Sequence, residues 1–161
     1  MGQIVIERGA DAAVFAGIHA ATVAVAYRPF FPVDSTPPTA DQLTGEWASR
    51  LADPTAVALL AIEDGRPVGS VVARADRQLP GGELAALHVL PTAWGQRIGS
   101  ALHDAALDLL RGAGYDTAWL WVLAANDRAR RMYERRGWTA RADLTQDYLG
   151  VPELRYFRSL A

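Results

Sequence analysis

The stretch from Leu87 to Leu110 constrains the fold more than any other part of this sequence. It begins inside a short apolar run, Leu84 to Leu90, that stops at Pro91, and such runs are typical of buried strands. After the proline, apolar residues recur at the spacing of one helical face. They are Ile98, Leu102, Ala105, Ala106, Leu109 and Leu110. The stretch therefore predicts a buried strand, a tight polar turn and an amphipathic helix.

The first turn of that helix has the composition of an anion site. Its residues are Gly95, Gln96, Arg97, Ile98, Gly99 and Ser100, with no acid among them. Backbone N–H groups in a first helical turn lack partners within the helix, and the helix dipole adds positive charge there. The turn therefore predicts a site for a phosphate or pyrophosphate. The patterns G-x-G-x-x-G and G-x-x-x-x-G-K-[ST] are both absent, which disfavours nucleotide folds of those two kinds.

Proline, glycine and capping residues divide the rest of the chain into further elements. An Asp-Gly pair at Asp64-Gly65 predicts a hairpin, and Asp11, Thr39 and Asn126 are suitable helix N-caps. The predicted strands are 4–6, 56–62, 68–73, 83–90, 118–123, 138–140 and 153–160, and the predicted helices besides the central one are 11–26, 39–51 and 127–136. The predicted order is therefore β-α-α-β-β-β-α-β-α-β-β, an α/β (α+β) chain.

An aromatic loop, which contains Tyr27, Phe30 and Phe31, follows the first predicted helix. The loop either plugs the end of the helix or forms a wall of a substrate pocket.

Composition limits the function classes. With 161 residues, half of them hydrophobic, the chain predicts a single domain over residues 1–161. The net charge of −2 gives no case for a nucleic-acid surface. The absence of cysteine excludes disulfides and an acyl-cysteine intermediate, and three scattered histidines make no metal site. Without a signal-peptide pattern or a long apolar segment, we expect a cytoplasmic protein that does not cross a membrane.

Two motifs resemble a known family. The run E-L-x-x-L-x-V-x-P-x-x-W-G-x-x-I-G-S-x-L starts at Glu83, and N-x-x-A-x-x-x-Y-E-x-x-G-W ends at Trp138. Together they resemble the GNAT superfamily of acyl-CoA-dependent N-acyltransferases. The resemblance implies a mixed, mostly antiparallel central sheet of six or seven strands flanked by about four helices. It also implies a cofactor cleft where strands 83–90 and 118–123 splay apart.

The chain departs from the family at the pyrophosphate turn, which is usually R/Q-x-x-G-x-G/A. Trp94 replaces the polar first residue, and Arg97 replaces the middle glycine. A side chain at position 97 is tolerated if its φ is negative, and it would then be able to contact phosphate. The alternative is that this side chain blocks close approach of the backbone to the phosphate.

The resemblance implies a role for several residues. Acetyl-CoA would be held at Gly95, Gln96, Arg97, Ile98, Gly99 and Ser100, by the backbone of Leu87, His88 and Val89, and by Asn126 and Tyr133. Tyr133 matches the family's general acid, although its helical spacing also fits a core residue. Glu83 matches a position at which some members carry a general base, although a strand-end carboxylate in solvent is the alternative. His88 is a second candidate base, whereas His19 and His103 are expected to be structural.

The implied function is transfer of an acetyl group from acetyl-CoA to a primary amine of a small molecule or peptide. Because there is no cysteine, direct attack by the amine in a ternary complex is the simplest mechanism. Tyr27, Phe30 and Phe31 are expected to line the acceptor pocket. The alternatives are a non-catalytic acyl-CoA-binding or sensor module of the same fold, and a protein-interaction domain; no nucleic-acid partner or metal is expected, and a homodimer is compatible with the sequence.

Overall fold

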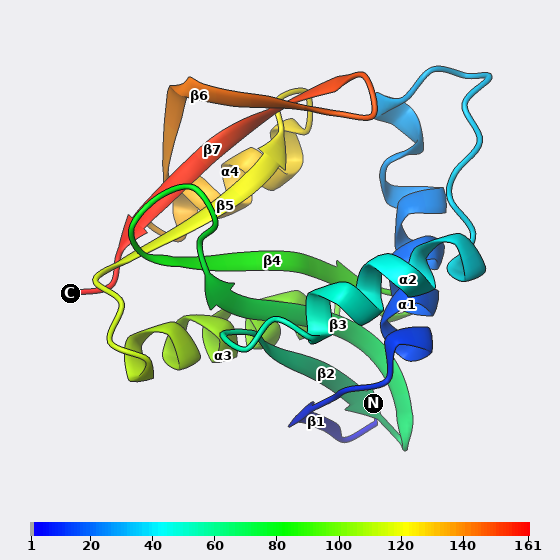
Figure 1. Ribbon diagram of the computed structural model, residues 1–161. Helices are drawn as coiled ribbons and strands as arrows, with labels where there is room; N and C mark the ends of the chain where they lie inside the picture. Colours follow the sequence, from blue (N-terminus) through cyan, green and yellow to red (C-terminus); the bar gives the residue numbers. More distant parts are fainter. Residues whose placement is uncertain (1) are drawn as a thin grey trace.

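The computed structural model describes residues 2–161 and shows one seven-stranded sheet with helices on both faces (Figure 1). The predicted order of elements and the mixed α/β class are confirmed. The strands are β1 (Ile4–Arg8), β2 (Val57–Glu63), β3 (Arg66–Ala75), β4 (Gly82–Val89), β5 (Thr117–Leu123), β6 (Thr139–Tyr148) and β7 (Val151–Ser159). The helices are α1 (Ala12–Ala26), α2 (Ala40–Leu51), α3 (Ile98–Gly112) and α4 (Asp127–Arg135), with short 3₁₀ turns at Arg28–Phe30 and Pro91–Ala93.

Three helices begin at the capping residues that the sequence predicts. The Asp11 side chain accepts a hydrogen bond from the Ala13 amide, and Asn126 accepts one from Ala129. Thr39 and Gln42 form a capping box at the start of α2, in which each side chain accepts from the other residue's backbone amide. Such caps satisfy amides that the first helical turn leaves without partners.

The hairpin of β2 and β3 turns at Asp64 and Gly65, as predicted. Both residues have positive φ, 49° and 78°, which is the conformation of the two-residue turn that matches strand twist.

The C-terminal hairpin differs from the prediction. A short strand at 138–140 followed by a long loop was expected, but β6 extends to Tyr148, and Leu149 and Gly150 form a two-residue turn into β7. Most residues of β6 are polar and exposed or half-buried, so the strand lacks the apolar alternation by which the others are found.

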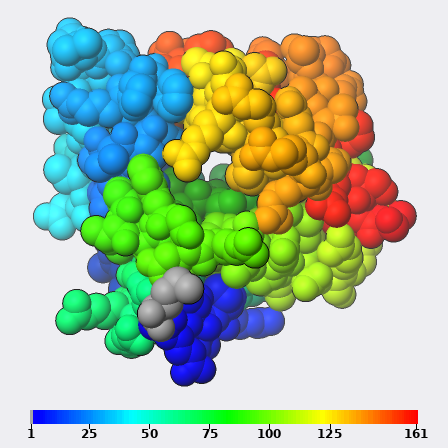
Figure 2. Space-filling view, turned by 180° about the vertical axis from the view of Figure 1, so that it is seen from behind, coloured from blue at the N-terminus to red at the C-terminus, as the bar shows by residue number. Residues whose placement is uncertain are grey.

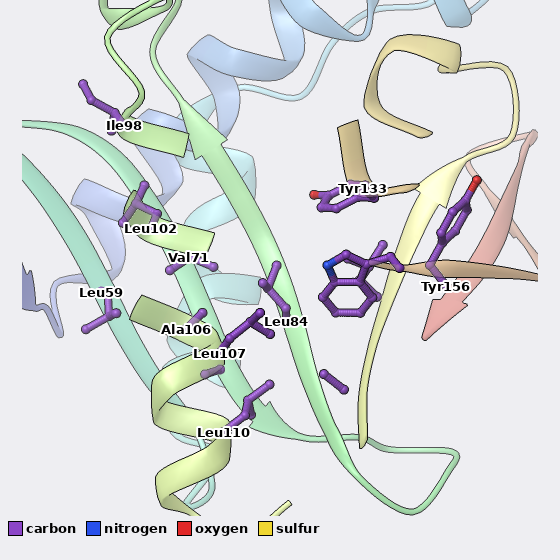
Figure 3. Close-up of a cluster of buried hydrophobic side chains, with 14 of the residues drawn as sticks. Leu59, Val71, Leu84, Ile98, Leu102, Ala106, Leu107, Leu110, Tyr133 and Tyr156 are labelled. Atoms are coloured by element: carbon purple, nitrogen blue, oxygen red, sulfur yellow. The ribbon is translucent and has the colours of Figure 1, made fainter. Parts of the chain in front are cut away.

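The helices cover both faces of the sheet (Figure 1). On one face α1 and α2 pack on β2 and β3 around Phe15 and Trp47. On the other face α3 packs on β2, β3 and β4 through Ile98, Leu102 and Leu110, in one cluster with Tyr133 of α4. Figure 3 shows this second cluster. Burial of these two apolar faces fixes the sheet between its helices.

The sheet is in the order β1-β2-β3-β4-β5-β7-β6, and β4 and β5 form its one parallel junction within the described residues. Only two residue pairs join these strands, Gly82 with Ala118 and Glu83 with Trp119. Beyond them β4 carries a bulge: its register with β3 shifts after Ala85, and Ala86 has a φ of +52°. Because a bulge bends a strand and increases its twist, β4 turns away from β5.

Candidate active site

A cavity of about 330 Å³ opens where β4 and β5 diverge. It is lined by β4 from Glu83 to His88, by Leu120 and Trp121 of β5, by Tyr133 of α4, and by side chains from α1, α2, β3 and the β6–β7 hairpin. Figure 2 shows a hollow between the green segment that precedes α3 and the yellow segment at the end of β5. The structure therefore forms a cleft at the splayed strands, where the sequence resemblance implied one.

The turn before α3 presents a row of free amides. The helix begins at Ile98, and within residues 2–161 the backbone N–H groups of Gly95 to Ser100 donate no hydrogen bond to the protein. Gly95 has a φ of +80°, which glycine adopts without strain. These amides, at the positive end of a helix, form a suitable cradle for a pyrophosphate.

Arg97 adopts a conformation that the sequence interpretation did not allow. A negative φ was the condition for tolerating a side chain there, but its φ is +61°, in the left-handed region. This conformation costs a non-glycine residue about 1–2 kcal/mol. The Arg97 side chain is exposed, so it points to solvent and does not fill the turn.

Trp94, the other departure from the family pattern, ties the turn to β4. Its indole Nε1 donates a hydrogen bond of 2.8 Å to the Val89 carbonyl, which also accepts one of 3.3 Å from the Thr22 hydroxyl. The Val89 carbonyl oxygen therefore already accepts two hydrogen bonds from within the protein. Leu87 and His88 line the cavity, whereas Val89 does not.

Tyr133 is packed in the core and also lines the cavity. Its ring is 8% exposed and packs against Trp138 and His103. In Figure 3 the ring lies between β4 and β5, with its hydroxyl pointing toward the β4 side. The hydroxyl has no hydrogen-bond partner in the described part of the chain, and burial raises the Tyr133 pKa to about 12, opposed by the Arg136 charge. Tyr133 is thus a core residue whose hydroxyl lies at the cavity wall and stays protonated.

Glu83 is buried rather than at a solvated strand end. The residue is 6% exposed, and one carboxylate oxygen accepts a 2.8 Å hydrogen bond from Nε of Arg74. Nη1 of Arg155 lies 4.0 Å from the other oxygen. Arg155 also pairs with Asp76, and both side chains of that pair are 1% exposed. Glu83 therefore faces the cavity within a buried network of two arginines and two carboxylates.

His88 and His19 form a stacked pair on the cavity wall, with ring centroids 4.4 Å apart. Nδ1 of His19 accepts a 3.1 Å hydrogen bond from Trp47. Burial, with a further contribution from the Arg50 charge, lowers the His19 pKa to about 4. Burial also holds the His88 pKa well below its ordinary value. Both rings are neutral at pH 7, and His19, expected to be structural, lines the cavity as well.

Of the remaining predicted residues, some line the cavity and others do not. His103 is structural, since its Nε2 accepts from the Trp138 indole. The Asn126 side chain caps α4 and does not line the cavity. Of the aromatic loop, Tyr27 lines the cavity, Phe31 packs on Tyr27 at 6.4 Å between centroids, and Phe30 is not part of the wall.

Sequence reasoning missed much of the charged wall. Arg50, Arg74, Arg155 and Tyr148 line the cavity but come from four different elements, so no local motif joins them. Arg74 offered the clearest signal, because it lies directly opposite Glu83 in the pairing of β3 and β4, where opposite charges attract.

Comparison with protein families gives one match that covers most of the chain. A family model described as "Acetyltransferase (GNAT) family" matches residues 20–138.

Curated relatives match over part of the chain. A mycothiol acetyltransferase from Beutenbergia cavernae is 45% identical over 71 residues, which is 44% of this chain and 23% of that protein. One from Sanguibacter keddieii is 40% identical over 100 residues, which is 57% of this chain and 32% of that protein. The chain thus spans a third or less of the length of these relatives.

Solved structures share the whole fold. An acetyltransferase of the GNAT family from Staphylococcus aureus superposes with a TM-score of 0.74 at 19% identity, over 99% of this chain and 100% of that one. A PaiA N-acetyltransferase from Thermoplasma acidophilum, solved in complex with coenzyme A, superposes with a TM-score of 0.73 at 14% identity, over 98% and 99%. At these identities the likeness shows the fold alone.

Two further observations concern membranes and metals. None of the helices described is long and apolar enough to span a bilayer. Residues 2–161 also bring together no group of three or more His, Cys, Asp or Glu side chains that would hold a metal ion.

Proposed function

The chain belongs to the GNAT family of acetyltransferases, and from this premise we propose that it transfers an acetyl group from acetyl-CoA to a primary amine. The observation that carries the proposal is the divergence of β4 and β5 after two residue pairs. It leaves one edge of β4 open to a cavity that Tyr133 also lines, and the free amides of Gly95 to Ser100 follow in the turn between β4 and α3.

The residues present fit acetyl-CoA. The amides of the turn before α3 are placed to donate to a pyrophosphate, and the backbone of Leu87, on the edge of β4 that faces away from β3, is placed to bind an amide-bearing arm. The co-substrate supplies a thioester, whose acetyl carbon an amine can attack directly. The chain itself contributes mainly by holding both reactants together, which accounts for much of the acceleration in such reactions.

Tyr133 is proposed as the proton donor to the departing sulfur. Burial raises the Tyr133 pKa to about 12. The hydroxyl is therefore protonated at neutral pH, and it can hydrogen-bond and donate as charge develops on sulfur. The position of this hydroxyl on the cavity wall favours a catalyst over a non-catalytic acyl-CoA-binding module of the same fold.

Glu83 is proposed to take the proton of the acceptor amine, directly or through a water. The carboxylate faces the cavity and is held in place by Arg74. His88 is the weaker candidate, because burial lowers its pKa and so makes the ring a poor proton acceptor.

The identity of the acceptor is a separate question. Relatives named mycothiol acetyltransferase place mycothiol-related amines in the panel to be tested. The panel also includes free amino acids, simple alkylamines and short peptides, since the chain matches only part of those relatives.

The test combines titration with a thiol-release assay. Acetyl-CoA and dephospho-CoA are titrated into the protein by calorimetry, and release of thiol is followed with each amine of the panel. We expect amine-dependent release, a fall of about 10²- to 10⁴-fold in kcat for Tyr133→Phe, and unchanged acetyl-CoA affinity. Tyr115→Phe is the matched control, because Tyr115 does not line the cavity. Binding without turnover would support the non-catalytic module, and no binding would refute the proposal.

A further inference from the structure

On the cavity wall, arginine hydrogen-bond donors are left free, whereas the carboxylate acceptors already have partners. Four arginines and three carboxylates line it. Each carboxylate already has partners. Asp76 pairs with Arg155, Glu83 accepts from Arg74, and Glu153 accepts a 2.6 Å hydrogen bond from Gln146. Burial also raises the Glu153 pKa.

Arg74 keeps an unused hydrogen-bonding edge. The residue is 8% exposed, and its Nε donates to Glu83 at 2.8 Å. Its two terminal nitrogens have no partner in the part of the chain that the structure describes. A planar guanidinium whose terminal nitrogens are free at a cavity wall is placed to bind a carboxylate.

Arg50 lies on the same wall and also has guanidinium nitrogens without a hydrogen-bond partner among residues 2–161. It belongs to the last turn of α2, where its guanidinium carbon stacks 4.7 Å from the Trp47 ring centroid. One terminal nitrogen donates to the exposed Glu46 at 2.7 Å, and the other two nitrogens have no partner among residues 2–161. Burial lowers the Arg50 pKa, and the nearby Arg74 charge lowers it further, while Glu46 opposes the shift. An anion beside both guanidiniums would relieve this repulsion.

Arg155 adds positive charge deeper in the wall. It is 1% exposed, its pairing with Asp76 uses one terminal nitrogen, and Nε and Nη1 are buried without a hydrogen-bond partner. Its guanidinium stacks over Trp121, 4.6 Å from the ring centroid. Asp76 and, at 4.0 Å, Glu83 compensate this charge, so the guanidiniums left with free edges for an anion are those of Arg50 and Arg74.

We propose that the acceptor carries a carboxylate besides its amine, and that Arg50 and Arg74 bind this carboxylate. The inference rests on the proposed function and names the acceptor class, amino acids or related amino-carboxylates. A singly charged carboxylate fits better than a phosphate dianion, because Glu83 and Asp76 also face this space and would repel the second charge. Polyamines and other polycations are the acceptors that the wall disfavours.

The first experiment compares matched acceptors at saturating acetyl-CoA. L-Phenylalanine is paired with L-phenylalaninamide, and β-alanine with propylamine. We expect kcat/KM to be about 10- to 100-fold higher for the carboxylate member of each pair, the range expected for a charge-assisted contact made at a partly buried arginine. Equal or reversed preference in both pairs would overturn the proposal while leaving amine acetylation intact.

Variants then assign the preference to a residue. Arg50→Gln is expected to reduce the carboxylate preference by about tenfold or more, and Arg50→Lys, which keeps the charge, to restore part of it. Arg111→Gln is the matched control, since Arg111 pairs with Asp108 on the surface of α3. A preference that Arg50→Gln leaves unchanged would contradict the assignment.

Binding of a product analogue separates this proposal from the failure of catalysis. N-acetyl-L-phenylalanine and its amide are titrated into the protein saturated with CoA. We expect tighter binding of the carboxylate form, and weaker binding of that form to Arg50→Gln, whether or not any amine is turned over. Preference for the carboxylate without turnover would uphold the anion site and refute the acetyl-transfer function. Equal binding of the two forms would refute the anion site.

Discussion

Neutralising Asp76 tests how much its buried pairing with Arg155 contributes to the fold. Asp76→Asn is a narrow perturbation. One oxygen of Asp76 accepts hydrogen bonds of 2.8 Å from the backbone amides of Gln78 and Leu79, and an asparagine oxygen can keep both. The substitution removes the charge, and it places an amide N–H₂ donor against the guanidinium of Arg155, which also donates.

The size of the effect follows from the burial of the pair. Removing one partner of a buried ion pair typically costs about 3–5 kcal/mol, because the other charge is left uncompensated. Both side chains are 1% exposed, but Glu83 stays 4.0 Å from Arg155 and compensates part of its charge. We therefore expect the lower end, a loss of about 3 kcal/mol in the free energy of unfolding. For a chain of this size the loss corresponds to a fall of about 6–12 °C in Tm.

Urea denaturation followed by circular dichroism measures this loss, with thermal melts in parallel. Asp108→Asn is the matched control, because Asp108 pairs with Arg111 on the surface at 3.1 Å and should change stability by less than about 0.5 kcal/mol. The double variant Asp76→Asn/Arg155→Met should be more stable than Asp76→Asn alone, since it leaves no unpaired charge. A loss below about 1 kcal/mol for Asp76→Asn, similar to the control, would refute the reasoning.

Two further predictions concern stability. Burial lowers the folded-state pKa of His19 from 6.5 to about 4, so below pH 6.5 the unfolded state binds more protons than the folded state. The free energy of unfolding should therefore fall as pH falls from 6.5 toward 4, by up to about 3 kcal/mol. His19→Gln should flatten that pH dependence in urea titrations, and an unchanged slope would contradict it. Arg97→Gly should raise the free energy of unfolding by about 0.5–1 kcal/mol, since glycine relieves the left-handed backbone. Arg97→Ala, which keeps the strain, should give no such gain, and equal stability of the two variants would show that φ is not the cause.

Local signals in the sequence predicted most of the fold. The caps at Asp11, Thr39 and Asn126 and the turn at Asp64 and Gly65 depend on side-chain or backbone chemistry within a few residues, so each could be identified directly. The amphipathic face of α3 was equally clear from its spacing.

Features that depend on tertiary packing were not predictable in this way. β6 is held in the sheet by its pairing with β7 rather than by an apolar face, so its polar sequence gave no strand signal. The bulge at Ala86 places a non-glycine residue at positive φ, which local preferences disfavour.

The residues of the candidate site fall into the same two groups, those recognisable from local sequence and those brought together only by tertiary packing. The turn from Gly95 to Ser100 and Tyr133 were predicted as site residues from motifs, because each lies in a continuous segment. Arg50, Arg74 and Arg155 meet only after α2, β3 and β7 come together, and neither length nor composition indicates which arginines will be buried.

The short junction between β4 and β5 also bears on the order in which the molecule folds. Strands β1 to β4 pair as antiparallel neighbours, and β5, β7 and β6 form a second such group. The junction between the groups instead closes a loop that contains all of α3, and pairings between distant segments form slowly because loop closure costs entropy before contacts repay it. We therefore expect the two strand groups to form before they join. The cavity would then lie at the last strand pairing to form. Opening motions should cost the least free energy there, and a molecule bound across β4 and β5 would add most to the stability of the native state.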